Sequence, residues 1–292
     1  MKVPINKTIE ELKAFTFERL VPINLREKNL EIDLRSVGFV DPYGMVSLII
    51  LAKSLSLKSI EVKIFLPDSQ DVLNYLERMD FFKEVPSCIN FDKDISYLQY
   101  NIRNPSESLK EVKKICREED VVDIVDTFAN ILVTRHRFNR QTVNKFSEIM
   151  IETFQNIPQH SSSSTDDYEP EGIAAIQDYK DHIYLALGDA GIGIKTSLLQ
   201  NPRYRRMALD DTRAIANVLK YGFSRYDVPG RGGGLQRVLS IVTRFNGQLL
   251  IRSMQGLVFA RKGKMKCFTV GNVGGTLIGI RIPKQVFLQE ST

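Results

Sequence analysis

The chain has 292 residues, 43% hydrophobic and 26% charged, which is typical of a soluble globular protein long enough for two domains. Its longest apolar run, Met45 to Ala52, is too short to cross a bilayer, and its N-terminus lacks the apolar stretch of a secretory signal, so we expect a cytoplasmic protein without a membrane span. The net charge of +5 is scattered among nearly as many acids as bases, which argues against nucleic acid as a partner. Three cysteines and three histidines show neither disulfide nor metal-ligand spacing, so we expect free thiols and no transition-metal site.

The first part of the chain alternates between strand and helix patterns. Strands are predicted at 30–37 and 60–67, and helices at 45–55 and 68–79. This alternation is typical of an α/β unit, and the pattern ends near residue 91. We therefore predict a first domain over residues 1–92.

The rest of the chain, residues 93–292, is predicted to form a second domain. Helices are expected at 118–135, 140–157 and 235–246, and strands at 95–103, 172–179, 182–189, 247–253, 256–262 and 274–283. The strands 172–179 and 182–189 are separated by two residues, as in a hairpin. This order of elements indicates a helical layer on a mixed sheet, and with the first unit it gives an α/β (α+β) fold class.

The helix expected at 140–157 has two distinct faces. Its apolar face is formed by Val143, Phe146, Met150, Phe154 and Ile157, which fall at helical spacing and should be buried. Glu148, Glu152 and Asn156 recur every four residues on the other face, and His160 follows where the helix should end. A solvated polar face would produce the same pattern, so the stripe alone does not identify a site.

Two further features carry chemistry. Asp189 ends an apolar strand and precedes Gly191 and Gly193, so its carboxylate could accept an amine hydrogen bond beside a flat ring, or form a plain Asx turn. The glycine-rich run Gly230 to Gly234 opens a predicted helix, which is the geometry of an anion site, although a flexible surface turn is the alternative. The run lacks the lysine of a P-loop and does not follow the first strand of a dinucleotide-binding unit.

Four stretches together resemble the conserved boxes of the GHKL ATPase superfamily, which includes histidine-kinase ATPase domains and anti-sigma factor kinases. They are "ETFQNIPQHS" (152–161), "DAGIGI" (189–194), "GRGGGLQRV" (230–238) and "GGTLIGIRIP" (274–283), in the order of that superfamily. The resemblance spans about Ile95 to Pro283 and implies a two-layer α/β sandwich of the Bergerat type that binds ATP and Mg²⁺.

The resemblance also implies a role for each matching residue. Asn156 would coordinate Mg²⁺, and Glu152 would be a general base. Asp189 would accept the adenine amine, and Thr276 would support the adenine. The remaining residues of the implied nucleotide site are Gly191, Gly193, Gly230, Arg231, Gly232, Gly233, Gly234 and Leu235.

The segment from Lys195 to Pro229 would be the ATP lid, and Arg225 or Arg231 would reach the γ-phosphate unless it is an ordinary surface charge. The chain departs from the family pattern at Ile157 and Pro158, so the helix should end early.

The first domain resembles a STAS domain over about Leu30 to Val85. In that family a strand ends at a turn that caps a helix, and here the turn is "DPYG", residues 41–44. The turn holds no serine to serve as a phosphoacceptor, so the resemblance implies a docking platform. A simple turn without that role is the alternative.

We therefore expect a Mg-ATP-binding regulatory protein. It would act either as a serine/threonine kinase of the anti-sigma type or as an ATP-controlled switch without catalysis. The implied partner is a protein, either STAS-like or of the sigma/anti-sigma type. A homodimer is a further alternative. No transducer domain follows the last glycine stretch, and His136 has no acidic neighbour, so topoisomerase-like and sensor-kinase functions are disfavoured.

Overall fold

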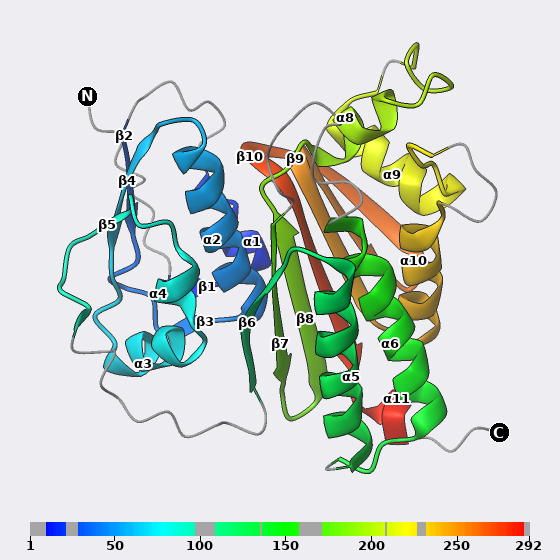
Figure 1. The fold of residues 1–292 in the computed structure, drawn as a ribbon, viewed down its shortest axis with the longest axis horizontal. Helices are drawn as coiled ribbons and strands as arrows, with labels where there is room; N and C mark the ends of the chain where they lie inside the picture. The colour runs from blue at the N-terminus through cyan, green and yellow to red at the C-terminus, as the bar shows by residue number, and fades with distance from the viewer. Residues whose placement is uncertain are drawn as a thin grey trace.

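The computed structural model describes residues 10–21, 29–96, 109–134, 136–157, 171–207, 209–226 and 232–288. A five-stranded sheet separates two layers of the molecule (Figure 1). Its strands are β6 (Leu109–Ile115), β7 (Gly172–Asp178), β8 (His182–Asp189), β10 (Lys264–Pro283) and β9 (Gln248–Arg261), in that spatial order. Every neighbouring pair is antiparallel, so the expectation of a mixed sheet is wrong.

One face of the sheet carries the helical layer. Its helices are α5 (Glu118–Thr134), α6 (Arg140–Phe154), α8 (Gly193–Leu199), α9 (Asp211–Tyr221), α10 (Gly234–Arg244) and α11 (Gln285–Leu288). The five apolar positions expected on the 140–157 helix are all buried, in one cluster with the inward residues of the sheet. This part of the predicted fold is confirmed. No helix among the described residues is long and apolar enough to cross a membrane.

The strands differ from the sequence prediction in two places. β6 was not predicted, and the expected strand at 95–103 lies almost entirely outside the described residues. The two strands expected at 247–253 and 256–262 are one continuous strand, β9. Met254 has a φ of 51°, and the register with β10 shifts beside it. The apparent break in the sequence is therefore a β-bulge inside one strand.

The N-terminal unit lies on the other face of the sheet. It contains the parallel strands β2 (Asn29–Asp33), β4 (Glu61–Phe65) and β5 (Asn90–Phe91), the short parallel pair β1 (Glu11–Leu12) and β3 (Phe39–Val40), and the helices α1 (Ala14–Phe17), α2 (Pro42–Ser56), α3 (Gln70–Arg78) and α4 (Phe81–Glu84). The "DPYG" stretch starts α2, because Asp41 Oδ1 accepts a hydrogen bond from the Gly44 amide at 2.7 Å. Asp41 is thus the N-cap and Pro42 the first helical residue.

Helix α2 packs directly on the sheet, against β8 and β10 (Figure 1). Three glycines of these strands make room for it. A Cβ at Gly279 would lie 2.7 Å from the Tyr43 ring, and one at Gly274 would overlap Ser54 Oγ. A Cβ at Gly188 would be 2.9 Å from Ile50. The side chains that approach these glycines recur along one face of α2, so this face is a built contact between the two units.

The contact buries α2 within the chain. A single apolar cluster contains residues of the N-terminal unit and of the sheet face beneath it. The start of α2, which the STAS resemblance would offer to a partner, is therefore covered by the chain's own sheet. The boundary between residues 92 and 93 stays a prediction.

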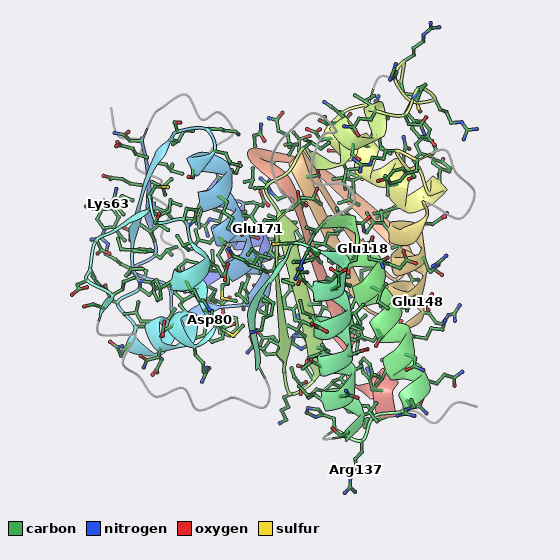
Figure 2. The ribbon with its side chains drawn as sticks, viewed as in Figure 1. Lys63, Asp80, Glu118, Arg137, Glu148 and Glu171 are labelled. Atoms are coloured by element: carbon green, nitrogen blue, oxygen red, sulfur yellow. The ribbon has the colours of Figure 1, made fainter. Side chains whose placement is uncertain are left out.

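Ion pairs add to this contact. Arg252 of β9 is 1% exposed, and its Nε lies 2.8 Å from Glu18 Oε1, just after α1. Lys53 of α2 pairs with Glu171, which also lies 3.4 Å from Lys114 of β6. Figure 2 shows Glu171 between α2 and the sheet. Because removing one partner of a buried pair leaves an uncompensated charge, these contacts oppose separation of the two units.

The glycine contact predicts a stability effect. Gly279→Ala places a methyl group against the Tyr43 ring, and overpacking of this kind costs about 1–3 kcal/mol. The free energy of unfolding from urea denaturation measures it. Gly38→Ala is the matched control, because its Cβ would meet nothing closer than 3.8 Å. Equal stability of the two variants would mean that α2 does not rest on this glycine.

Candidate functional site

A cavity lies between the helical layer and the sheet, at the end of β8. It brings together residues from all four stretches that the sequence analysis singled out. The residues expected from sequence that line it are Asn156, Asp189, Gly193, Gly232, Gly233, Gly234, Leu235 and Thr276. Glu152 and Gly191 lie next to this lining but are not part of it. Gly230, Arg231 and His160 lie outside the described residues.

Asp189 is held at the wall of the cavity. It is the last residue of β8 and pairs in register with Thr276 of β10. Its Oδ1 accepts a hydrogen bond from the Gly191 amide at 2.8 Å, so the Asx turn left open by the sequence is formed. Burial raises the pKa of Asp189 to about 6, against the lowering effect of the Gly191 and Thr276 amides. The turn therefore holds a carboxyl group on the cavity wall, where it is buried from solvent.

The Asp189 turn also requires a glycine on the neighbouring strand. Gly275 has a φ of 83°, and a Cβ there would overlap the Asp189 carbonyl oxygen. Only a residue without a side chain allows this approach. The double glycine at the start of "GGTLIGIRIP" thus has two separate functions, because Gly274 makes room for α2 on the other face.

Asn156 follows the end of α6 at the cavity. Its Nδ2 donates a hydrogen bond to the carbonyl oxygen of Glu152, one turn earlier. This contact orients the amide and leaves Oδ1 without a donor among the described residues. A free amide oxygen at the cavity is the kind of ligand that Mg²⁺ takes together with phosphate oxygens. The side chain therefore fits the metal role that the resemblance implies.

Glu152 does not line the cavity, and its carboxylate lies beside the start of α10. Its Oε1 forms an ion pair with Arg237 Nη1, and Arg237 Nε also lies 3.9 Å from Glu148 Oε1. Figure 2 shows Glu148 on the outer side of the helical layer. A Cβ at Gly234 would lie 2.5 Å from Glu152 Oε2, so the carboxylate rests against the first residue of α10. The sequence analysis missed Arg237, which looks like any charge on an exposed helix face.

The glycine run has the backbone that only glycine adopts readily. Gly232 has a φ of 102° and Gly233 a φ of 79°. Gly233 is the N-cap of α10 and has no side chain that could satisfy the first amides of the helix. The first N–H groups of α10 thus have no N-cap side chain as acceptor, and an anion in the cavity would accept their hydrogen bonds.

The wall opposite the sheet comes from the expected lid. Leu198 of α8, Val218 of α9 and Phe223 give it an apolar surface, followed by Ser224 and Arg225. The sequence analysis missed Phe223 as a site residue. Its ring lines the cavity and stacks on Tyr204, with the ring centroids 4.5 Å apart.

Charge and polarity divide the cavity into two parts. Its apolar walls and the buried Asp189 carboxyl suit a flat ring with an amine group, and the glycine amides suit phosphate groups. Asn156 lies in the same cavity as the glycines. The arrangement can hold a ligand with an aromatic part and an anionic part.

No protein-family model matches the sequence, and no curated protein matches it. Among solved structures, the fold is similar to a chain of the SiaB-SiaC complex from Pseudomonas aeruginosa. The sequence identity is 12%, and the match covers 61% of this chain and 90% of that chain. Its TM-score is 0.33, at which the similarity carries no argument about the function of this chain.

Proposed function

We propose that the chain is a regulatory protein that binds Mg-ATP in this cavity and changes its lid, and hence its protein contacts, with nucleotide. The proposal rests on the fact that four separate stretches of the chain meet at one place. Stretches around residues 156, 189, 232–234 and 276, which are far apart in sequence, line a single cavity. These are the stretches that resemble the GHKL boxes, and chance placement would scatter them.

In this proposal the adenine ring lies between the sheet and the apolar lid residues, and its amine donates to the Asp189 carboxylate. The phosphates accept hydrogen bonds from the glycine amides before α10. Asn156 Oδ1 would hold Mg²⁺, which supplies charge neutralisation between the phosphate groups when it is bound. Every one of these groups belongs to this chain and lines the cavity or opens onto it.

The size of the cavity supports a lid that moves. Its volume is about 90 Å³, whereas ligand sites usually measure roughly 300–1,000 Å³. The sheet and the helical layer, including α8 and α9 of the lid, are packed by buried apolar residues, so the part of the lid that can yield is the stretch from Phe223 to Arg225. Nucleotide binding therefore requires this segment to rearrange.

A kinase function is kept as a second candidate because of Glu152. It lies one turn before Asn156 and rests against the start of α10, near where a γ-phosphate would bind. Its ion pair with Arg237 favours the switch without catalysis, since the carboxylate must leave Arg237 to reach a nucleophile. In either case, we propose that the partner is a protein of the STAS-like or sigma/anti-sigma type.

Limited trypsin digestion tests the proposed lid. Arg203, Arg205 and Arg206 are exposed in the segment after α8. We expect rapid cleavage there in the free protein and protection by Mg-ATP, because an ordered lid no longer enters the protease. Cleavage after Lys58, an exposed site at the end of α2, is the internal control and should not change. Equal lid cleavage with and without Mg-ATP would contradict closure on nucleotide.

A further inference from the structure

The sheet face that packs against the N-terminal unit borders two cavities at one end. Residues alternate between the two faces of a strand, so Arg281 shares a face with Gly279, which contacts Tyr43 of α2. By the same alternation, Tyr184 and His182 of β8 lie on this face. They lie beyond the start of α2, near the turn that joins β7 and β8.

Two adjoining cavities occupy this end of the sheet, and we call them together the basic groove. One has a volume of about 630 Å³ and the other about 260 Å³, and they share Gln248 and Arg281. The lining of the larger includes Lys180, Asp181, His182, Arg261, Arg281 and Lys284. The smaller includes three aromatic side chains, Phe15, Tyr184 and Phe259.

The charges of the groove are mostly positive and poorly compensated. Four cationic side chains line the larger cavity against one carboxylate, that of Asp181. The smaller cavity adds Lys13 and the buried carboxyl group of Asp41. Lys284 pairs with Asp178 at 2.6 Å. For Lys180, Arg261 and Arg281, no carboxylate lies within ion-pair distance in the described ranges. An accumulation of unpaired cations in a cavity favours binding of an anion.

Arg281 is the central group of the groove. It is partly buried, and its Nη2 lies 3.1 Å from His182 Nδ1. His182 Nδ1 also lies 2.6 Å from Asp181 Oδ1. A single ring nitrogen cannot donate a hydrogen bond to Asp181 and accept one from Arg281 at the same time. Arg281 therefore has at most one of its N–H donors engaged there. Among the described residues, the partly buried guanidinium of Arg281 has no carboxylate at ion-pair distance, which leaves room for an anion to pair with it.

We propose that the basic groove binds a small organic anion with two or more carboxylate or phosphate groups. Arg281 and Arg261 would contact the anionic groups, and Phe15 and Phe259 would border the organic part. The volume of the groove is that of a small-molecule site. The described walls of the groove do not form an extended row of basic side chains and stacked aromatic rings, which is the arrangement that binds single-stranded nucleic acid.

This groove is separate from the nucleotide cavity. His182 begins β8 at the groove, and Asp189 ends the same strand at the nucleotide cavity. At about 3.3 Å per residue, the two sites are about 23 Å apart along the strand. The inference therefore does not depend on ATP binding.

Calorimetric titration of the full chain with citrate and with pyrophosphate, at constant ionic strength, tests the groove. We expect both anions to bind, and Arg281→Gln and Arg261→Gln each to weaken them about 10- to 100-fold. Arg261 is exposed, so its variant tests the groove even where Arg281→Gln does not fold. Arg213→Gln, an exposed arginine on α9, is the matched control and should bind as the wild type does.

A fourth variant separates the groove from the nucleotide cavity. Asn156→Ala should keep the affinity for both anions, because Asn156 lines the nucleotide cavity and not the groove. Pyrophosphate binding that is lost in Asn156→Ala and kept in Arg261→Gln would place the anion in the nucleotide cavity and overturn the proposal. Binding of neither anion, binding weakened equally by Arg213→Gln, or binding of a duplex oligonucleotide alone would also overturn it.

Discussion

Glu152→Ala is expected to lower ATP turnover or phosphoryl transfer about 10²–10⁴-fold and to leave the affinity for Mg-ATP nearly unchanged. The carboxylate would act on the nucleophile, and it does not line the nucleotide cavity. It is paired with Arg237, so catalysis requires that this ion pair open. Steady-state phosphate release and titration calorimetry measure the two quantities separately.

Asn156→Ala is the matched variant on the same helix face. It removes the oxygen that would hold the metal, so it should weaken Mg-ATP binding, and the loss should disappear when Mg²⁺ is omitted. Glu152→Ala should show no such dependence on Mg²⁺. If Glu152→Ala weakened binding as much as Asn156→Ala and left residual turnover unchanged, Glu152 would be a structural residue and the switch without catalysis would be favoured.

Asp189→Asn is expected to weaken ATP binding by about 1–3 kcal/mol, or about 5- to 150-fold, because a buried polar contact with the adenine amine is lost. The same change should not destabilise the ligand-free protein at pH 7. Burial raises the folded-state pKa of Asp189 to about 6, above the ordinary value of 3.8. The folded state therefore holds a proton that the unfolded state releases between these values.

The sign of this effect follows from the proton count. Between about pH 4 and pH 6 the free energy of unfolding falls as the pH rises, and ionised Asp189 costs up to about 3 kcal/mol at pH 7. An asparagine side chain cannot ionise, so Asp189→Asn removes this part of the pH dependence. Urea denaturation at pH 5 and pH 7 measures it. A variant less stable than the wild type at pH 7, with unchanged affinity for ATP, would make Asp189 a structural residue only.

Local patterns made part of the fold predictable. The 140–157 helix and the hairpin of β7 and β8 follow from spacing and from the two-residue turn, which need only neighbouring residues. The docking of α2 could not be predicted, because it depends on Gly279 and Gly188 meeting side chains more than a hundred residues away. β6 was missed because its lysine-rich sequence reads as a solvated segment, and pairing with β7 supplies what the sequence lacks.

The same distinction applies to the candidate site. Asn156, Asp189 and the glycines were predicted because each stands in a short motif whose order is informative. Phe223 and Arg237 were missed because their positions depend on how the lid and α10 pack. An exposed arginine at helical spacing gives no signal until its carboxylate partner, on another helix, is known.

Titration calorimetry of the full wild-type chain with ATP and with GTP, each with and without Mg²⁺, tests the nucleotide assignment most directly. We predict that one ATP binds per chain in the presence of Mg²⁺ and that chelation of the metal weakens it. GTP has a carbonyl oxygen where adenine has the C6 amine that would donate to Asp189, so it should bind about 5- to 150-fold more weakly. The absence of ATP binding, or equal affinities for ATP and GTP that Asp189→Asn leaves unchanged, would contradict the account.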